Sequence, residues 1–304
     1  MKCKKHISIE LSGGIGNQLF QYAAGIYFAK RLNSEVLFKL FGNTAKQKKT
    51  KNALLEFSLN STVIENKRPM SNLSYQIGRV RRKIANNSNF YRMFRYHTFG
   101  DYQSNSIGFT GELTTLSKIR SLKGYFQTYK YADAVKVELE QELRLKNPST
   151  TYEKYLIIAK ETCPIMMHIR GTDYKENIRT IGMLDKNYYE NALLKVKEFG
   201  LRNKLWVFSD DEIYTNKLMK QLKILPDKVF SPNSGLSDTE TLKLMSVGYG
   251  IIISNSTFSW WAAYLNKNCR FIICPDKWFK GMEDPYLLLP EHWIKVQTSW
   301  LQYK

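Results

Sequence analysis

Three apolar segments in the second half of the sequence each end in polar residues that could bind an anionic nucleotide. An arginine offers a planar charged fork that suits bidentate phosphate binding. Ser and Thr at the start of a helix present free backbone N–H groups and a favourable dipole to an anion. A carboxylate could accept the paired N–H donors of a guanine edge. The residues are His168 and Arg170 around the end of segment 165–169, Asp210 and Asp211 after 205–208, and Ser256 and Thr257 after 250–253.

Each of these residues also has an ordinary structural interpretation. Arg170 could form an ion pair with a nearby Asp, Ser256 could simply cap a helix, and Asp210 and Asp211 could be solvated. However, ligands of doubly wound sheets bind beyond the carboxyl ends of the strands. Three strand ends that supply such chemistry to one sheet edge therefore favour a ligand site.

A glycine turn, residues 13–18, follows the first apolar segment of the chain. It resembles a dinucleotide-binding fingerprint only in part, because position 19 is Leu and Glu35 is a poor ribose ligand. The turn is either a tight strand-to-helix connection or a backbone that approaches a ligand closely. In the second case Asn17 and Gln18 would supply amide groups.

The surrounding pattern predicts an α/β fold that can position these residues. β-rich apolar segments alternate with helical ones, which is typical of parallel sheets covered on both faces. We expect a first domain over 1–150, a second over 151–304, and a hinge at 147–150. The predicted strands are 7–11, 36–38, 165–169, 205–208, 250–253 and 271–274; the predicted helices are 187–199, 212–223 and 238–247, the last opened by a capping box from Ser237 to Glu240.

The charge of the chain is uneven. Of 46 Lys and Arg and 27 Asp and Glu in 304 residues, the first 150 residues hold 25 basic and 10 acidic ones, so they carry +15 of the net +19. Residues 66–100 contain no acidic residue and mix Lys and Arg with aromatics. This segment favours an anionic membrane surface, and a solvated surface loop is the alternative. A nucleic-acid-binding protein is the rival class, but no known motif of that class is present.

The termini and the cysteines predict a cytoplasmic protein, and the basic segment 66–100 favours a peripheral position on the inner face of a bacterial membrane. The basic start lacks the apolar stretch of a signal peptide, because Glu10 and the glycine turn come too early. No apolar run approaches the roughly 20 residues that cross a bilayer. Four cysteines are too few for a secreted disulfide framework, and their spacing does not suit zinc.

Five motifs are spread over most of the chain, between residues 13 and 279. They are residues 13–23 (GGIGNQLFQYA), 124–127 (GYFQ), 168–174 (HIRGTDY), 254–263 (SNSTFSWWAA) and 275–279 (PDKWF). These motifs resemble those of the α-1,2-fucosyltransferases, glycosyltransferase family 11, and occur in family order. The resemblance implies a GT-B fold of two Rossmann-like domains that face a central cleft. It also implies an inverting transfer of L-fucose from its GDP sugar to the 2-hydroxyl of a galactoside in an O-antigen or capsule.

The resemblance also implies roles for individual residues. Arg170 would contact the β-phosphate, Ser256 and Thr257 the diphosphate, and His168 with Asp210 or Asp211 the nucleotide. No metal or other cofactor is expected, since no Asp-x-Asp triplet is present. Further donor-binding residues would be Phe258, Gly14 and Gly16; the acceptor-side residues would be Gln18, Glu176 and Trp278; and the candidates for the base or its positioning amide are Asp173, Glu176 and Asn17.

The sequence departs from the family pattern at one position. The family usually has two adjacent arginines, whereas Gly171 follows Arg170 here. Arg170 can act alone, as in related fucosyltransferase families, but the missing second arginine leaves more than one donor sugar to consider. A GDP-linked deoxysugar other than fucose, such as colitose, is one alternative, and a UDP or dTDP sugar is another. Asp173 could equally orient Arg170 instead of acting as the base.

Overall fold

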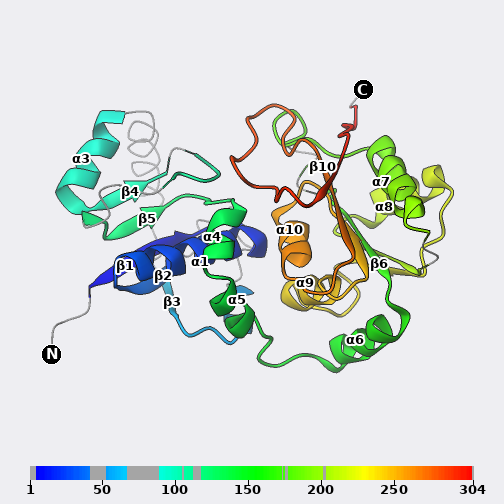
Figure 1. The fold of residues 1–304 in the computed structure, drawn as a ribbon, viewed down its shortest axis with the longest axis horizontal. Helices are drawn as coiled ribbons and strands as arrows, with labels where there is room; N and C mark the ends of the chain where they lie inside the picture. The colour runs from blue at the N-terminus through cyan, green and yellow to red at the C-terminus, as the bar shows by residue number, and fades with distance from the viewer. Residues whose placement is uncertain are drawn as a thin grey trace. The chain divides into compact units, whose positions relative to one another are not determined.

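The chain folds into two compact units, each built on a parallel β-sheet (Figure 1). The computed structural model describes residues 5–41, 53–66, 89–104, 106–111, 118–172, 174, 177–200 and 203–302. The first unit comprises residues 1–144 and 285–288, and the second comprises 145–284 and 289–304. The predicted α/β class is therefore confirmed.

The sheet of the first unit has the order β3-β2-β1-β5-β4 with every pairing parallel. The strong alternation of residues 7–11 and the apolar run 36–38 were sufficient to predict β1 and β2, and both extend slightly further than the pattern suggests. β3 has five residues, β4 and β5 have three each, and none of the three was predicted. The elements are β1 (His6–Leu11), α1 (Ile15–Arg31), β2 (Glu35–Phe41), η1 (Ala53–Glu56), β3 (Thr62–Asn66), α3 (Asn89–Phe99), β4 (Asp101–Gln103), β5 (Ser121–Lys123), α4 (Tyr129–Ala134) and α5 (Lys136–Glu142).

The sheet of the second unit has the order β11-β10-β9-β6-β7-β8, again all parallel. Its four central apolar strands match the predicted ones: β6, β7 and β10 have five residues each, and β9 has three, although the apolar run was predicted to extend to residue 253. β8 and β11 have three residues each, too few to show a period in the sequence. The elements are α6 (Thr150–Thr162), β6 (Ile165–Ile169), α7 (Lys186–Glu198), β7 (Leu205–Ser209), α8 (Glu212–Leu222), β8 (Lys228–Phe230), α9 (Asp238–Met245), β9 (Gly250–Ile252), α10 (Thr257–Tyr264), β10 (Phe271–Pro275) and β11 (Ile294–Val296).

Polar side chains begin the helices of the second unit. Ser237 accepts from the backbone N–H of Glu240, whose side chain accepts from the backbone of Ser237, so the predicted capping box of α9 is confirmed. The side chains of Asp185 and Asp211 accept from backbone N–H groups at the starts of α7 and α8, respectively. Such caps satisfy N–H groups that have no partner within the helix, and they fix where each helix leaves the sheet.

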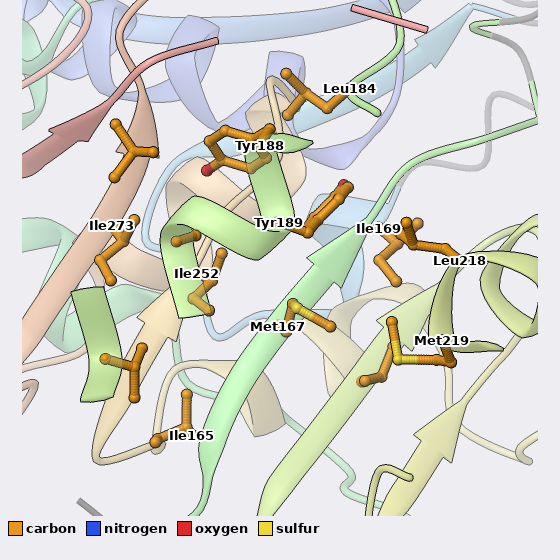
Figure 2. Packing of buried hydrophobic residues seen from close by; sticks show 14 of the residues in the cluster. Ile165, Met167, Ile169, Leu184, Tyr188, Tyr189, Leu218, Met219, Ile252 and Ile273 are labelled. Carbon is orange, nitrogen blue, oxygen red and sulfur yellow. The ribbon is translucent and has the colours of Figure 1, made fainter. Parts of the chain in front are cut away.

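One hydrophobic core of the second unit lies between the sheet and the pair α7 and α8 (Figure 2). Met167 and Ile169 of β6 point toward Tyr189 of α7, and Leu218 of α8 covers the neighbouring strand. Strand β6 is buried along its whole length. A central strand that is buried on both faces holds its carboxyl end in a fixed position, and the predicted site lies at that end.

The chain leaves the first unit between Arg144 and Leu145, and residues 285–288 return to it. The segment 147–150, which we expected to be a hinge, leads into α6, where the Ser149 side chain accepts from Tyr152 N. Within the first unit Leu287 O accepts hydrogen bonds from Tyr129 N and Thr128 Oγ1. None of the helices among the described residues is long and apolar enough to cross a membrane.

Candidate active site

Strands β9, β6 and β7 are neighbours, so their carboxyl ends meet at one edge of the second sheet. We call the polar residues at this edge the strand-end cluster: His168, Arg170, Gly171, Asp210, Asp211 and Ser254 to Thr257. The sequence predicted that these three strand ends lie together, and the sheet order confirms it.

His168 lies at the end of β6 and is 3% exposed. Its Nδ1 lies 2.8 Å from Ser254 Oγ at the end of β9, and its ring lies 5.6 Å from that of Phe258. Burial, and then the charge of Arg170, lowers the pKa of His168 to about 3, although Asp210 acts in the opposite direction. The imidazole is therefore neutral at physiological pH, and a neutral ring offers one donor and one acceptor.

Asp210 holds the loop that follows β6. Its Oδ1 accepts from Gly171 N at 2.8 Å, and its Oδ2 accepts from Thr172 Oγ1 and lies 3.1 Å from Arg170 Nη1. Arg170 and Asp210 are both partly buried, so this pair is better shielded from water than a surface ion pair. The structural alternative for these two residues, an ion pair, is thus what the structure shows.

Asp211 points differently from its neighbour Asp210. It is 7% exposed, and its Oδ1 accepts from Tyr214 N at 2.9 Å as the cap of α8. Its side chain also fills the space beside Gly171, since a Cβ added there would lie 2.5 Å from Asp211 Cβ and 2.8 Å from Oδ2. The glycine that replaces the second arginine is therefore in contact with a buried carboxylate.

The loop after β9 leads into α10. Ser256 is the cap of α10, and its side chain accepts from Phe258 N at 3.3 Å. Asn255, which is 1% exposed, holds the loop because its Nδ2 donates to three backbone carbonyls. The three acceptors are the carbonyls of Ile181 (3.3 Å), Gly182 (3.2 Å) and Trp278 (3.2 Å).

Tyr174 links this loop to the arginine. Its hydroxyl donates to Asn255 O at 2.8 Å, and the guanidinium of Arg170 lies 5.6 Å above its ring. The aromatic ring thus supports the cation from one side. Arg170 and the N-terminus of α10 are consequently held in one assembly of side chains, as an anion site requires.

The first unit contains a second group of polar residues, which we call the glycine-turn cluster: Ser12 to Gln21 with Gly124 to Thr128. Gly14 caps α1 without a side chain, and a Cβ added to it would meet nothing within 4 Å. Gln21 of α1 accepts from Ser12 N (2.9 Å) and donates to Gly124 O (3.0 Å). Two motifs that lie more than 100 residues apart in the sequence therefore meet here.

Known proteins resemble this chain over nearly its whole length. The model of glycosyl transferase family 11 matches residues 2–287. The chain belongs to this family. Two curated relatives from Escherichia coli are each 26% identical to it: an α-1,2-colitosyltransferase, with 94% of this chain and 97% of the relative covered, and the O-antigen biosynthesis glycosyltransferase WbnK, with 94% and 99% covered.

Solved structures confirm the GT-B type of the fold. The NodZ α-1,6-fucosyltransferase co-crystallized with GDP matches with a TM-score of 0.54 at 14% identity, over 90% of this chain and 95% of that one. A family 9 glycosyl transferase from Veillonella parvula matches with a TM-score of 0.50 at 11% identity, over 100% and 90%. The family 11 assignment favours a glycosyltransferase over the alternative of a nucleic-acid-binding protein.

Two of the residues predicted for the acceptor side of this family 11 glycosyltransferase have buried side chains. Gln18 is fully buried and donates to Gly13 O at 3.0 Å, and Trp278 is 2% exposed. Gly16 is buried within α1, while Gly14 is exposed at its start. Asp173 and Glu176 lie outside the described residues.

Other residues of this family 11 glycosyltransferase were not predicted as part of the site. Tyr174 and Asn255 lie inside the recognised motifs, but only the fold shows which groups they contact. Gln127 likewise ends the GYFQ motif, and its partner Asn17 lies 110 residues earlier. Among the described residues no group of three His, Cys, Asp or Glu side chains could hold a metal ion.

Proposed function

We propose that this glycosyltransferase transfers L-fucose from GDP-β-L-fucose to the 2-hydroxyl of a galactoside, with inversion at the sugar. In this proposal the second unit binds the nucleotide sugar and the basic first unit receives the acceptor. The relatives support this assignment because one acts in O-antigen biosynthesis and one is an α-1,2-transferase of a deoxysugar.

The observation that carries the proposal is the position of Arg170. It is held by Asp210 and by the ring of Tyr174, and Tyr174 also binds the loop that begins α10. A diphosphate bound there would meet a guanidinium, the N–H groups of the helix start, and the hydroxyls of Ser256 and Thr257. His168, neutral and buried beside them, would contact the nucleotide.

The chemical step requires stabilisation of the leaving GDP. Negative charge develops on the β-phosphate as its bond to the sugar breaks, and fixed donors that point at this charge lower the barrier. We propose that Arg170 and the N-terminus of α10 supply this stabilisation without a metal ion or other cofactor. In this proposal Phe258, Gly14 and Gly16 complete the donor site.

The acceptor hydroxyl must lose a proton as it attacks the sugar. Asp173 in the motif 168–174 and Glu176 just after it are the carboxylates that could take this proton, and Asn17 could position the hydroxyl. An oxocarbenium-like transition state would lower the demand for a strong base. The acceptor side of the proposal thus depends on Asn17 and on these two carboxylates.

The donor sugar has a second candidate because of Gly171. A relative that covers 94% of this chain is a colitosyltransferase, and this chain has one arginine where the family usually has two. GDP-colitose is therefore the alternative donor within the same mechanism.

A donor screen tests the proposed function. Purified enzyme is incubated with β-galactosides and GDP-fucose, GDP-colitose, GDP-mannose, a UDP sugar or a dTDP sugar. We expect product with a GDP-deoxysugar and an α-1,2 linkage to galactose in the NMR spectrum of the product. Turnover with UDP or dTDP sugars alone, or attachment at another hydroxyl, would contradict the proposal.

The basic first unit is proposed to meet an anionic membrane surface on the cytoplasmic side, where a lipid-linked acceptor would be presented. Of the segment 66–100, the structure describes residue 66 and residues 89–100, which include α3. This helix exposes Met93, Phe94 and Phe99 and carries Arg92 and Arg95, with Arg95 paired to Asp101. Aromatic and basic side chains on one helix are typical of interfacial binding.

Vesicle sedimentation tests the membrane proposal. We expect the enzyme to pellet with anionic vesicles at low salt and to be released at high salt, since each Lys or Arg near the surface contributes about 1 kcal/mol. Phe94→Ser is expected to weaken this binding, while the exposed Leu225→Ser in the second unit serves as the control. Equal binding to neutral and anionic vesicles would refute the electrostatic part.

A further inference from the structure

Gln127 and Asn17 form a pair of amides in the glycine-turn cluster. Asn17 lies in the first turn of α1, and Gln127 lies between β5 and α4. Gln127 Nε2 donates to Asn17 Oδ1 at 3.0 Å. Four residues further along α1, Gln21 donates to Gly124 O. Positions i and i+4 of one helix face therefore both contact the segment 124–127.

The backbone around Gln127 is fixed in an unusual conformation. Phe126 has a φ of +53°, in the left-handed region that a bulky residue rarely adopts. Its ring is fully buried and lies 6.1 Å from that of Phe28 and 6.2 Å from that of Tyr131. Gln127 N donates to Ile107 O at 2.7 Å. The aromatic packing and the backbone bond together aim the side chain of Gln127 at Asn17.

This contact sets the orientation of the Asn17 amide. With Oδ1 engaged by Gln127, the N–H₂ group is the part of the amide that remains available. Asn17 is partly exposed, and its Nδ2 has no hydrogen-bond partner among the described residues. Gly13 makes this arrangement possible, because a Cβ at Gly13 would lie 2.4 Å from Asn17 Nδ2.

Gln127 also carries a polar atom that does nothing for the fold. The residue is 6% exposed, and its buried Oε1 has no hydrogen-bond partner in the part of the chain that the structure describes. A buried acceptor without a partner is unfavourable, and an apolar side chain of similar length would avoid that cost. The polar side chain of Gln127 thus lowers stability but orients the partly exposed amide of Asn17. A role in function explains why a polar residue stands here.

We propose that Gln127 is a positioning residue of the transferase: it holds the Asn17 amide with Nδ2 toward the substrate, where that group donates to a sugar oxygen. The inference rests on the proposed function, in which Asn17 lies at the substrate. Gln127 itself acts only through Asn17, because its free oxygen is buried.

The first test is Gln127→Met, which keeps the length of the side chain and removes both polar atoms. We expect kcat to fall roughly 10- to 100-fold, as for a misaligned reacting group, with a melting temperature equal to or above that of the wild type. In an Asn17→Ala background the same substitution is expected to change kcat less than twofold. The control is Gln141→Met on α5, an exposed amide of the same unit, for which we expect wild-type kinetics.

The second test is Gln127→Glu, which keeps the shape. An ionised carboxylate can only accept, so the Asn17 amide would turn Nδ2 toward it and present Oδ1 to the substrate. A protonated carboxyl can donate to Asn17 Oδ1 as Gln127 does. We therefore expect the activity of this variant, relative to the wild type, to rise as the pH is lowered.

Two results would overturn the proposal. One is a Gln127→Met variant whose kinetics do not show coupling to Asn17. This would be the case if its kcat and KM for both substrates equalled those of the wild type, or if the substitution lowered kcat as much in the Asn17→Ala background as in the wild type. The other is a clear fall in melting temperature, which would make Gln127 a structural residue and which requires no activity to detect. If the wild-type enzyme transfers none of the sugars in the donor screen, the proposed function fails, and the stability result still tests Gln127.

Discussion

Arg170→Lys is expected to lower kcat about 100-fold, the size of effect seen when one well-placed donor to a developing negative charge is removed. In the structure the guanidinium binds Asp210 and lies over the ring of Tyr174. A planar fork can hold both contacts and still bind a phosphate in its own plane, whereas an ammonium is a single point charge. The measurement is steady-state kinetics with the donor identified by the screen.

The control for Arg170→Lys is Arg270→Lys, an exposed arginine of the same unit, which is expected to leave kcat and KM unchanged. Asp210→Asn adds a second comparison. If Asp210 acts by holding Arg170, its substitution will cost far less in the Arg170→Lys background than in the wild type. Near-normal kcat/KM for Arg170→Lys would show that this residue does not bind the phosphate.

The sequence predicted the sheet of the second unit because its central strands are buried on both faces. Continuous runs such as residues 165–169 and 205–208 can be recognised without their neighbours. The strands β8 and β11 have three residues each and are placed by pairing with β7 and β10. Their own residues carry no periodic pattern, so only the folded sheet reveals them.

The sequence predicted the location of the strand-end cluster, but it did not predict which contacts each of its residues makes. Asp210 and Asp211 look equivalent in the sequence, but one binds the loop of Arg170 and the other caps α8. Adjacent residues at a strand end project to different sides, and the pattern does not say which one faces the ligand. The pair of Asn17 and Gln127 was missed because a contact across 110 residues depends on the whole first sheet.

The arginine that this chain lacks cannot simply be added, and Gly171→Arg is expected to destabilise the enzyme. Its Cβ would lie 2.5 Å from Asp211 Cβ, closer than real side chains approach, and Asp211 is the buried cap of α8. Forcing extra atoms into a packed site costs about 1–3 kcal/mol, and a lost cap costs about 1 kcal/mol more. We expect a melting temperature several degrees lower and no gain in kcat with either GDP-fucose or GDP-colitose.

Gly14→Ser is the matched control for Gly171→Arg, because a Cβ at Gly14 meets nothing within 4 Å and its backbone is extended, as for any helix cap. Serine is a good cap, so its melting temperature is expected to equal or exceed that of the wild type. Asp211→Gly combined with Gly171→Arg removes the clashing Cβ and is expected to recover part of the stability. A wild-type melting temperature for Gly171→Arg alone would mean that Asp211 moves aside without cost. The single arginine would then reflect a choice of donor sugar instead of a packing constraint between β6 and β7.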